Sequence, residues 1–167
     1  MVHRLLNSDA IGTTVASKAL GETLIVHRTK ASVLVVDDDA SSRFVLSKAV
    51  EGLGYRAVVA EDGTDVPELV AKERFDLLVL DLYMPGMNGF ELLRQIRKPV
   101  AGLLPAPRTP SDVPVLIVSG ESDPDSLANI KSLGADYHLS KPVDLTEFED
   151  RVRSALRTRQ KKKVPGS

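Results

Sequence analysis

The chain has 167 residues, of which 27% are charged and 43% hydrophobic, and its formal net charge is -1. This balance is typical of one soluble globular domain and gives no indication of binding to nucleic acid or membranes. The chain has no cysteine, which excludes disulfides, thiolate metal sites and cysteine nucleophiles. No segment has the pattern of a signal peptide or a membrane span, so we expect a soluble, cytoplasmic protein that is not exported.

Residues 1–30 form a first segment that mixes glycine and threonine with scattered apolar residues. Ile11, Val15 and Ala19 would share one face of a helix, but Gly12 and the nearby threonines disfavour a helix here. The ends of protein chains are commonly poorly ordered. We therefore expect an extension of unknown role that is loose or partly docked, rather than an independent functional element.

From residue 31 onward, short apolar runs alternate with amphipathic stretches. The apolar runs predict strands at 32–36, 56–60, 76–80, 114–119 and 136–139. The stretches between and after them predict helices at 40–53, 66–73, 89–97, 124–133 and 145–158. This alternation predicts an α/β fold with a doubly wound parallel sheet of five strands.

Capping patterns support three of the predicted helix starts. Asp39 directly precedes the first helix, where its side chain is suited to be the N-cap. Asp123 precedes Pro124, which matches an N-cap followed by proline at the first helical position. Asp144 lies three residues before Glu147, as in a capping box.

Two further segments interrupt or follow the predicted domain, which spans 31–158. The segment 98–114 carries five prolines and predicts a long irregular loop, inserted before the fourth strand. It lies at the end of the sheet opposite the carboxyl ends of the strands, so we expect it to modify a partner surface or to have no role. Residues 159–167 form a basic tail, which we expect to be solvated.

Polar residues follow the carboxyl ends of the predicted strands, where open α/β sheets bind their ligands. They are Asp37, Asp38, Asp39, Asp81, Ser119 and Lys141. Several carboxylates can bind a hard dication such as Mg2+, and a lysine and a serine hydroxyl can bind an anion. This set predicts a place where a phosphoryl group is received, with Asp39 left out of the metal site because it is expected to cap the helix.

Four motifs lie in register on these strands: VVDDD (35–39), LLVLDLYMPGMNGFELLRQIR (77–97), VLIVSGES (115–122) and GADYHLSKPV (134–143). In order and spacing they resemble the receiver domain of two-component response regulators, a bacterial signalling family. The resemblance covers about residues 31 to 158. It implies a flavodoxin-like fold with strand order 2-1-3-4-5, and phosphorylation of Asp81 by a phosphohistidine of a histidine kinase or phosphotransfer protein.

The resemblance also implies the ligands of a Mg2+ cofactor. Asp38, Asp81 and the backbone carbonyl of Tyr83 would bind the ion, and Asp37 would contribute through water. Ser119 and Lys141 would then hold the phosphoryl oxygens. The peptide bond between Lys141 and Pro142 is expected to be cis.

Besides the inserted segment 98–114, two features depart from the family pattern. His138 stands where the family usually has a tyrosine or phenylalanine, a ring that swings inward when the hydroxyl residue moves. This histidine either fills the position or couples the switch to pH, because imidazole titrates near neutrality. Tyr83 and Glu121 lie at the positions that flank the approach of hydrolytic water, and the Tyr83 ring is suited to shield an acyl phosphate.

Other functions stay open at this stage. An aspartate-nucleophile phosphatase needs a second acid two residues after the nucleophile, where this chain has Tyr83. A receiver-like module that binds proteins without phosphorylation is the other alternative. Because the chain ends soon after the last helix, we expect signalling through a protein contact rather than through an encoded output domain. A dimer that forms on phosphorylation is a further alternative.

Overall fold

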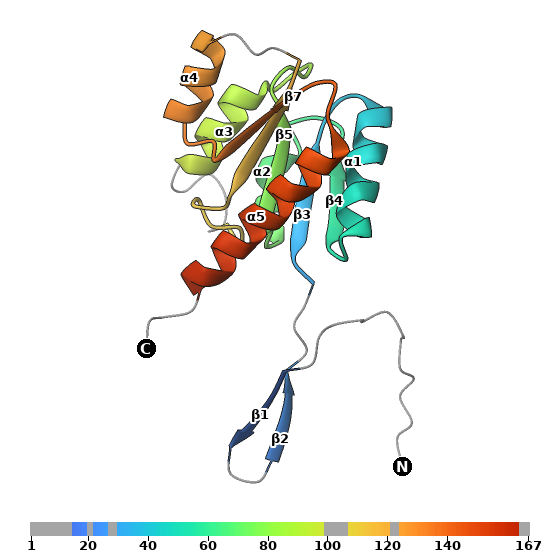
Figure 1. Cartoon of the computed structure of the whole chain (residues 1–167). Coiled ribbons are helices and arrows are strands. Elements are labelled where there is room, and N and C mark those ends of the chain that lie inside the picture. Colours follow the sequence, from blue (N-terminus) through green and yellow to red (C-terminus); the bar gives the residue numbers. More distant parts are fainter. Residues whose placement is uncertain (1–14, 20–21, 27–29, 99–106, 121–123, 164–167) are drawn as a thin grey trace, which may run out of the picture. The chain divides into compact units, whose positions relative to one another are not determined.

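The computed structural model describes residues 15–19, 22–26, 30–98, 107–120 and 124–163. Figure 1 shows the whole chain, which divides into two compact units, Met1–Lys30 and Ala31–Ser167. In the first unit, strand β1 (Val15–Ala19) pairs antiparallel with strand β2 (Glu22–Val26).

The first unit therefore contains a pair of strands, whereas its sequence has the pattern of a weak helical face. Val15 and Ala19 lie at the two ends of a strand, and Ile11 is outside the described residues. The strand β2 contains threonine, isoleucine and valine, whose branched Cβ atoms favour extended backbone.

The second unit is built on a five-stranded parallel sheet (Figure 1). Its strands are β3 (Ser32–Val36), β4 (Arg56–Ala60), β5 (Leu77–Asp81), β6 (Val115–Ser119) and β7 (Tyr137–Ser140). They lie in the order β4-β3-β5-β6-β7, and every neighbouring pair is parallel. Within this sheet the order is 2-1-3-4-5, so the predicted flavodoxin-like fold is confirmed.

Five helices connect or follow these strands in the described residues. They are α1 (Ala40–Gly52), α2 (Val66–Lys72), α3 (Gly89–Arg97), α4 (Pro124–Ser132) and α5 (Leu145–Lys163). The helix α5 continues beyond its predicted end at residue 158. The expectation of a solvated tail is wrong for Arg159, which is helical and only 7% exposed. Arg159 continues the buried face of Phe148 and Val152 at helical spacing, and arginine favours a helix.

The predicted caps that fall in the described residues are present. Asp39 Oδ1 accepts a hydrogen bond of 2.6 Å from the Ser42 backbone N–H at the start of α1. Asp144 Oδ1 accepts one of 2.9 Å from the Glu147 N–H at the start of α5. Asp123 lies outside the described residues, although α4 does begin at Pro124 as predicted.

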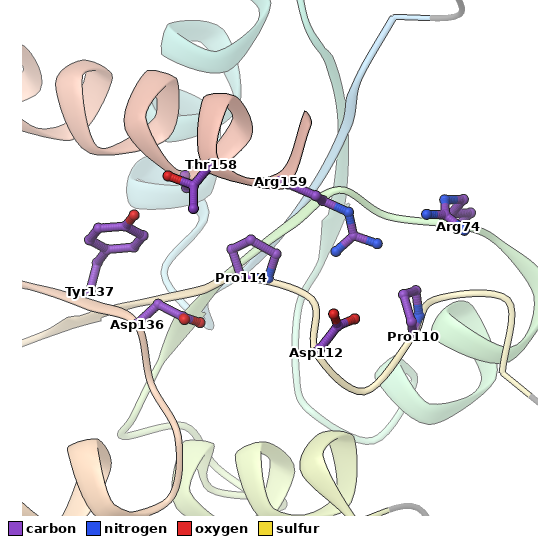
Figure 2. Close-up of a pocket in the computed structure, with 9 residues that line it drawn as sticks. Arg74, Pro110, Asp112, Pro114, Asp136, Tyr137, Thr158 and Arg159 are labelled. Atoms are coloured by element: carbon purple, nitrogen blue, oxygen red, sulfur yellow. The ribbon is translucent and has the colours of Figure 1, made fainter. Parts of the chain in front are cut away.

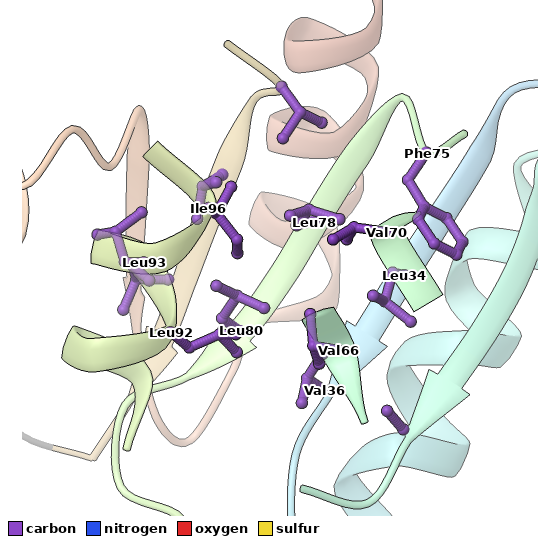
Figure 3. Close-up of a cluster of buried hydrophobic side chains, with 14 of the residues drawn as sticks. Leu34, Val36, Val66, Val70, Phe75, Leu78, Leu80, Leu92, Leu93 and Ile96 are labelled. Atoms are coloured by element: carbon purple, nitrogen blue, oxygen red, sulfur yellow. The ribbon is translucent and has the colours of Figure 1, made fainter. Parts of the chain in front are cut away.

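Alternate strand residues point to opposite faces of the sheet and bury two apolar clusters. On one face, Leu34 and Val36 of β3 pack with residues of α2, α3 and α4 (Figure 3). On the other face, Val33 and Val35 pack with residues of α1 and α5. Both faces are covered, which is why the central strands are continuously apolar and why they hold their ends rigidly.

The described part of the 98–114 segment docks against the second unit at the amino ends of the strands. The Thr109 hydroxyl accepts a hydrogen bond from the Phe75 N–H and donates one to the Glu73 carbonyl, at 2.9 and 2.7 Å. Within the described residues, no helix combines the length and the apolar character that a membrane crossing requires.

Candidate functional site

The register of the sheet brings the predicted site residues to one edge. Val36 of β3 lies opposite Leu80 of β5, so Asp37 and Asp81, which follow them, are neighbours. Ser119 at the end of β6 lies opposite Ser140 at the end of β7, directly before Lys141. All of these strands are parallel, and their carboxyl ends therefore meet at this edge.

Lys141 bridges the two buried aspartates of this edge. Its Nζ atom donates hydrogen bonds to Asp37 Oδ2 at 2.8 Å and to Asp81 Oδ2 at 2.5 Å. Asp37 is 1% exposed and Asp81 is 5% exposed. Burial by itself lowers the pKa of Lys141, but the hydrogen bonds and charges of both aspartates outweigh it and raise that pKa above its ordinary value. Lys141 is therefore held in its charged form. The Lys141–Pro142 peptide bond is cis, as expected.

Asp37 is fixed by further hydrogen bonds from the start of α1. The Ser42 hydroxyl donates to Asp37 Oδ2 at 2.6 Å, and the Asp39 N–H donates to Asp37 Oδ1 at 2.9 Å. Both carboxylate oxygens are thus oriented by the loop and helix that follow β3. Because Asp39 caps α1 with its own side chain, it is directed to the helix and not to the cluster.

Ser42 and Arg43 are site residues that the sequence reasoning missed. Arg43 Nη1 donates to the backbone carbonyls of Asp37 and Asp38 at 2.7 and 2.9 Å, which fixes the loop that carries them. Their position in the sequence indicates this role, because polar residues in the first turn of a helix lie over the loop from which that helix begins.

Three carboxylates of this edge form a candidate cation site. Ligand oxygens of Asp37, Asp38 and Asp81 all lie within 4.8 Å of one another, and Asp38 is exposed to solvent. Lys141 forms ion pairs with Asp37 and Asp81, and the Arg43 guanidinium binds the backbone carbonyls of Asp37 and Asp38. The carboxylate oxygens of this cluster match the preference of Mg2+ for oxygen ligands.

The loop after Asp81 is held close to it by glycine. A Cβ atom on Gly89 would lie 2.4 Å from the carbonyl oxygen of Asp81 and 2.7 Å from Cα of Leu82, closer than packing allows. Gly86 has a φ of 85°, which is a left-handed conformation that glycine adopts readily. The Tyr83 N–H donates to Asp81 Oδ1 at 3.1 Å. The loop thereby orients the aspartate that it follows.

The Tyr83 side chain lies at the rim of this edge. It is 45% exposed, and its ring packs edge-on against Phe90 of α3, with 6.3 Å between the ring centroids. Glu121, the other residue expected to flank the site, lies outside the described residues.

Ser119 and His138 form a second polar pair beside the cluster. Ser119 is fully buried, and its Oγ atom lies 3.3 Å from His138 Nε2, within hydrogen-bond distance. His138 lies on β7 opposite Ile117, and burial lowers its pKa. The neutral imidazole is therefore favoured in the folded protein. A Cβ atom on Gly120, next to Ser119, would meet no atom of the described residues within 4 Å.

The arrangement gathers a carboxylate that can act as a nucleophile, carboxylates that can hold a cation, and groups that can bind an anion. Asp81 offers a carboxylate at the end of β5, the Ser119 hydroxyl lies at the end of the neighbouring strand β6, and Lys141 directly follows β7. The family model of the response regulator receiver domain matches residues 33–153, which includes all of them. The chain belongs to this family.

Curated relatives of this receiver domain are longer proteins. The probable transcriptional regulator ycf27 of Guillardia theta is 35% identical over 133 residues, which cover 80% of this chain and 48% of that protein. The response regulator MprA of Mycobacterium leprae is 35% identical over 125 residues, which cover 75% of this chain and 50% of that protein. The DNA-binding transcriptional regulator NtrC of Escherichia coli K12 is 37% identical over 133 residues, which cover 80% of this chain and 26% of that protein. The chain thus spans half or less of the length of these relatives.

Solved structures match the receiver domain over nearly their whole length. The chemotaxis response regulator CheY4 of Vibrio cholerae has a TM-score of 0.66 and 29% identity, over 77% of this chain and 100% of that one. A CheY-like receiver domain protein of Methanospirillum hungatei has a TM-score of 0.68 over 80% of this chain and 99% of that one. Its identity of 22% shows a shared fold alone.

Proposed function

We propose that this receiver domain, which we place at residues 31–158, accepts a phosphoryl group on Asp81 from a phosphohistidine of a histidine kinase or phosphotransfer protein. The observation that carries the proposal is the ion pair of Lys141 with both Asp37 and Asp81 at the carboxyl edge of the sheet. An ammonium group beside an acceptor carboxylate is suited to offset the charge that phosphoryl oxygens bring.

In the proposed transfer, a carboxylate oxygen of Asp81 bonds to phosphorus while the bond from phosphorus to the donor's imidazole nitrogen breaks. The electron pair of the broken bond leaves with the imidazole. Lys141 donates a hydrogen bond to one phosphoryl oxygen, and the Ser119 hydroxyl donates to another. Ser119 ends β6, the strand that pairs with the strand of Asp81, and Lys141, which follows β7, already contacts Asp81.

We further propose Mg2+ as the cofactor, because the three carboxylates fit its preference for oxygen ligands. Asp38, Asp81 and the Tyr83 carbonyl would bind the ion, and Asp37 would contribute through a water molecule. When bound, the ion supplies positive charge that neutralises the phosphoryl oxygens.

The phosphoryl group adds about two negative charges and new acceptor oxygens, which would draw the Ser119 hydroxyl away from His138. We propose that this movement is the signal and that His138 is the switch residue. The output is a protein contact on the surface of α4, β7 and α5. Tyr83 and Glu121 flank the approach of the water that hydrolyses the acyl phosphate. We assign no catalytic turnover other than this autodephosphorylation.

The decisive experiment is the intact mass of the chain after incubation with acetyl phosphate and Mg2+. We expect a gain of one phosphoryl group that is absent in Asp81→Asn and strongly reduced when EDTA replaces Mg2+. Asp65→Asn, which removes a carboxylate outside the cluster, is the matched control and should gain the group normally. A folded wild type that gains no mass, also with a phosphorylated histidine donor, would favour a module that binds proteins without phosphorylation.

A further inference from the structure

A pocket of about 140 Å³ lies at the edge of the sheet opposite Asp81 (Figure 2). The 98–114 segment forms one wall with Pro110, Asp112 and Pro114, and the start of β7 and the last turns of α5 form the others. The loop before β5 contributes Arg74. The pocket therefore exists because the proline-rich segment docks at this edge, and it shares no residue with the carboxylate cluster.

Arg159 is the unusual residue of this pocket. Its side chain is only 8% exposed, and among the described residues its Nε and Nη1 atoms have no hydrogen-bond partner. Nε lies 3.4 Å from Asp76 Oδ1 in an ion pair that does not satisfy hydrogen-bond geometry. Burial of a guanidinium group is costly unless its N–H donors are hydrogen-bonded, and the Asp76 ion pair leaves Nε and Nη1 of Arg159 without hydrogen bonds among the described residues.

The neighbours of Arg159 do not supply enough compensation. Burial lowers the pKa of Arg159, which the Asp76 and Asp112 carboxylates offset only in part, and Arg74 lowers it further. Asp136, the other acid of the pocket, is already bound by Arg97 at 3.0 Å and by the Val115 N–H at 2.9 Å.

The size and lining of the pocket restrict what it holds. The pocket volume of about 140 Å³ exceeds the roughly 10–15 Å³ that one water molecule needs. It is smaller than the roughly 300 Å³ of binding sites for drug-sized molecules. Pro110 and Pro114 provide apolar surface near the two arginines, and Tyr137 lines the end of the pocket away from Arg74 (Figure 2). Guanidinium groups pair with carboxylates and phosphates through parallel hydrogen bonds, but the Asp112 carboxylate on the wall disfavours a doubly charged anion.

We propose that this pocket binds a small monocarboxylate, whose carboxylate accepts hydrogen bonds from Arg159 and Arg74 and whose short apolar part packs on Pro110 and Pro114. The ligand lies outside the proposed phosphorylation chemistry, and its binding needs neither Mg2+ nor Asp81. The role of the proline-rich segment is then to complete this ligand site.

The test is a titration of the isotope-labelled full chain with sodium butyrate in the absence of Mg2+, followed by backbone amide resonances. We expect saturable shifts at Arg74, Asp112 and Arg159, with Tyr83 and Ser119 unaffected. Butan-1-ol, which has the same hydrocarbon chain without the carboxylate, should produce no saturable shift there. Equal or tighter binding of inorganic phosphate, or no saturable shift with butyrate, would overturn the proposal.

Variants separate a ligand contact from a structural role. Arg159→Met should weaken butyrate binding at least about tenfold. Because the substitution also removes the ion-pair partner of Asp76, we expect a lower thermal midpoint without butyrate, and the butyrate response of the variant is compared with its own value. Butyrate should raise the midpoint of wild type but not of this variant, at matched ionic strength. Arg157→Met, an exposed arginine on the same helix, should respond as wild type does.

If Arg159→Met does not fold, butyrate binding by Arg74→Gln tests the site instead. Arg74 is exposed, so its replacement preserves the packing. Weaker butyrate binding by Arg74→Gln supports the site, and unchanged binding overturns it. An undiminished butyrate response of folded Arg159→Met contradicts the proposal directly.

Discussion

Lys141 Nζ and Asp81 Oδ2 lie 2.5 Å apart, although 60 residues separate them in the chain. The same ammonium group contacts Asp37, so one cation holds two buried carboxylates together. The Lys141 side chain is itself 27% exposed, which leaves this otherwise buried ion pair open to solvent on one side.

Lys141→Gln should destabilise the protein in the absence of Mg2+, because Asp37 and Asp81 then face each other without the ammonium group. We expect the free energy of unfolding to fall by about 1–3 kcal/mol, less than for a fully buried pair. Since the pKa of Lys141 is raised in the folded state, its contribution is complete at neutral pH and is lost only as the pH rises through that raised value. Urea unfolding with EDTA measures the effect. Lys131→Gln, an exposed lysine on α4, is the control, and an equally small change in both variants would contradict the prediction.

Asp38→Asn should weaken Mg2+ binding by about tenfold or more, because it removes an exposed carboxylate of the proposed metal site. Asp39→Asn is a matched control that removes the same charge one residue away. Asparagine is as good an N-cap as aspartate, so α1 should be retained. Calorimetric titration with MgCl2 compares the two, and similar losses of affinity would mean that general electrostatics, not ligation, is responsible.

His138→Phe should make the protein less sensitive to mild acid. Burial lowers the pKa of His138 in the folded state, so the unfolded chain binds a proton at higher pH. Wild type should therefore lose stability as the pH falls below about 6.5, and the phenylalanine variant should lose less. Denaturant unfolding at about pH 7.5 and pH 5.5 provides the comparison. The affinity of phosphorylated wild type and phosphorylated His138→Phe for a partner protein, measured at the same two pH values, tests whether the switch has the same pH dependence. Identical pH dependence in both measurements would leave His138 as a residue that only fills its position.

Tyr83→Asn should shorten the lifetime of the proposed acyl phosphate, because the ring at the rim no longer hinders water. A change of about threefold to tenfold corresponds to about 1 kcal/mol of barrier. The decay of phosphorylated protein, followed by intact mass, gives the rate. Phe90→Leu, which removes the ring against which Tyr83 packs, should give a smaller change in the same direction. An unchanged lifetime in Tyr83→Asn would show that the ring is not in the path of water.

Gly89→Ala should destabilise the protein by about 2 kcal/mol or more, because its Cβ would overlap the backbone of Asp81 and Leu82. Gly120→Ala should change stability by less than about 0.5 kcal/mol, since the same atom there meets no described residue within 4 Å. Thermal and urea unfolding of both variants test the contrast. Comparable losses would mean that the loop after Asp81 is able to move away.

The sheet was predictable because a parallel strand that is buried on both faces reads as an unbroken apolar run. The runs that end before Asp37 and Asp81 show this most clearly, and the polar residue that ends each run is conspicuous. In open α/β sheets the carboxyl ends of the strands form the ligand site, so these ends are expected to lie together even when no side-chain position is known. The closeness of Asp37, Asp81 and Lys141 follows from that rule.

Ser42, Arg43 and Arg159, whose contacts were not predicted, do not stand out from their neighbours in the sequence. Ser42 and Arg43 are ordinary polar residues of a helix start, and only their contacts distinguish them from solvated neighbours. Arg159 lies in a basic run, where its helical spacing from Phe148 and Val152 was the only sign of burial. In residues 15–26, glycine and threonine disfavour a helix, but no turn or strand pattern there predicts the pairing of β1 with β2.

The order of the parallel strands has a consequence for biosynthesis. Asp37 emerges from the ribosome first, but its ammonium partner is added more than a hundred residues later, after β7. During translation the two buried carboxylates therefore have to remain apart, solvated or protonated until Lys141 appears. The completed cluster is thus a marker that the nascent domain has acquired its last strand.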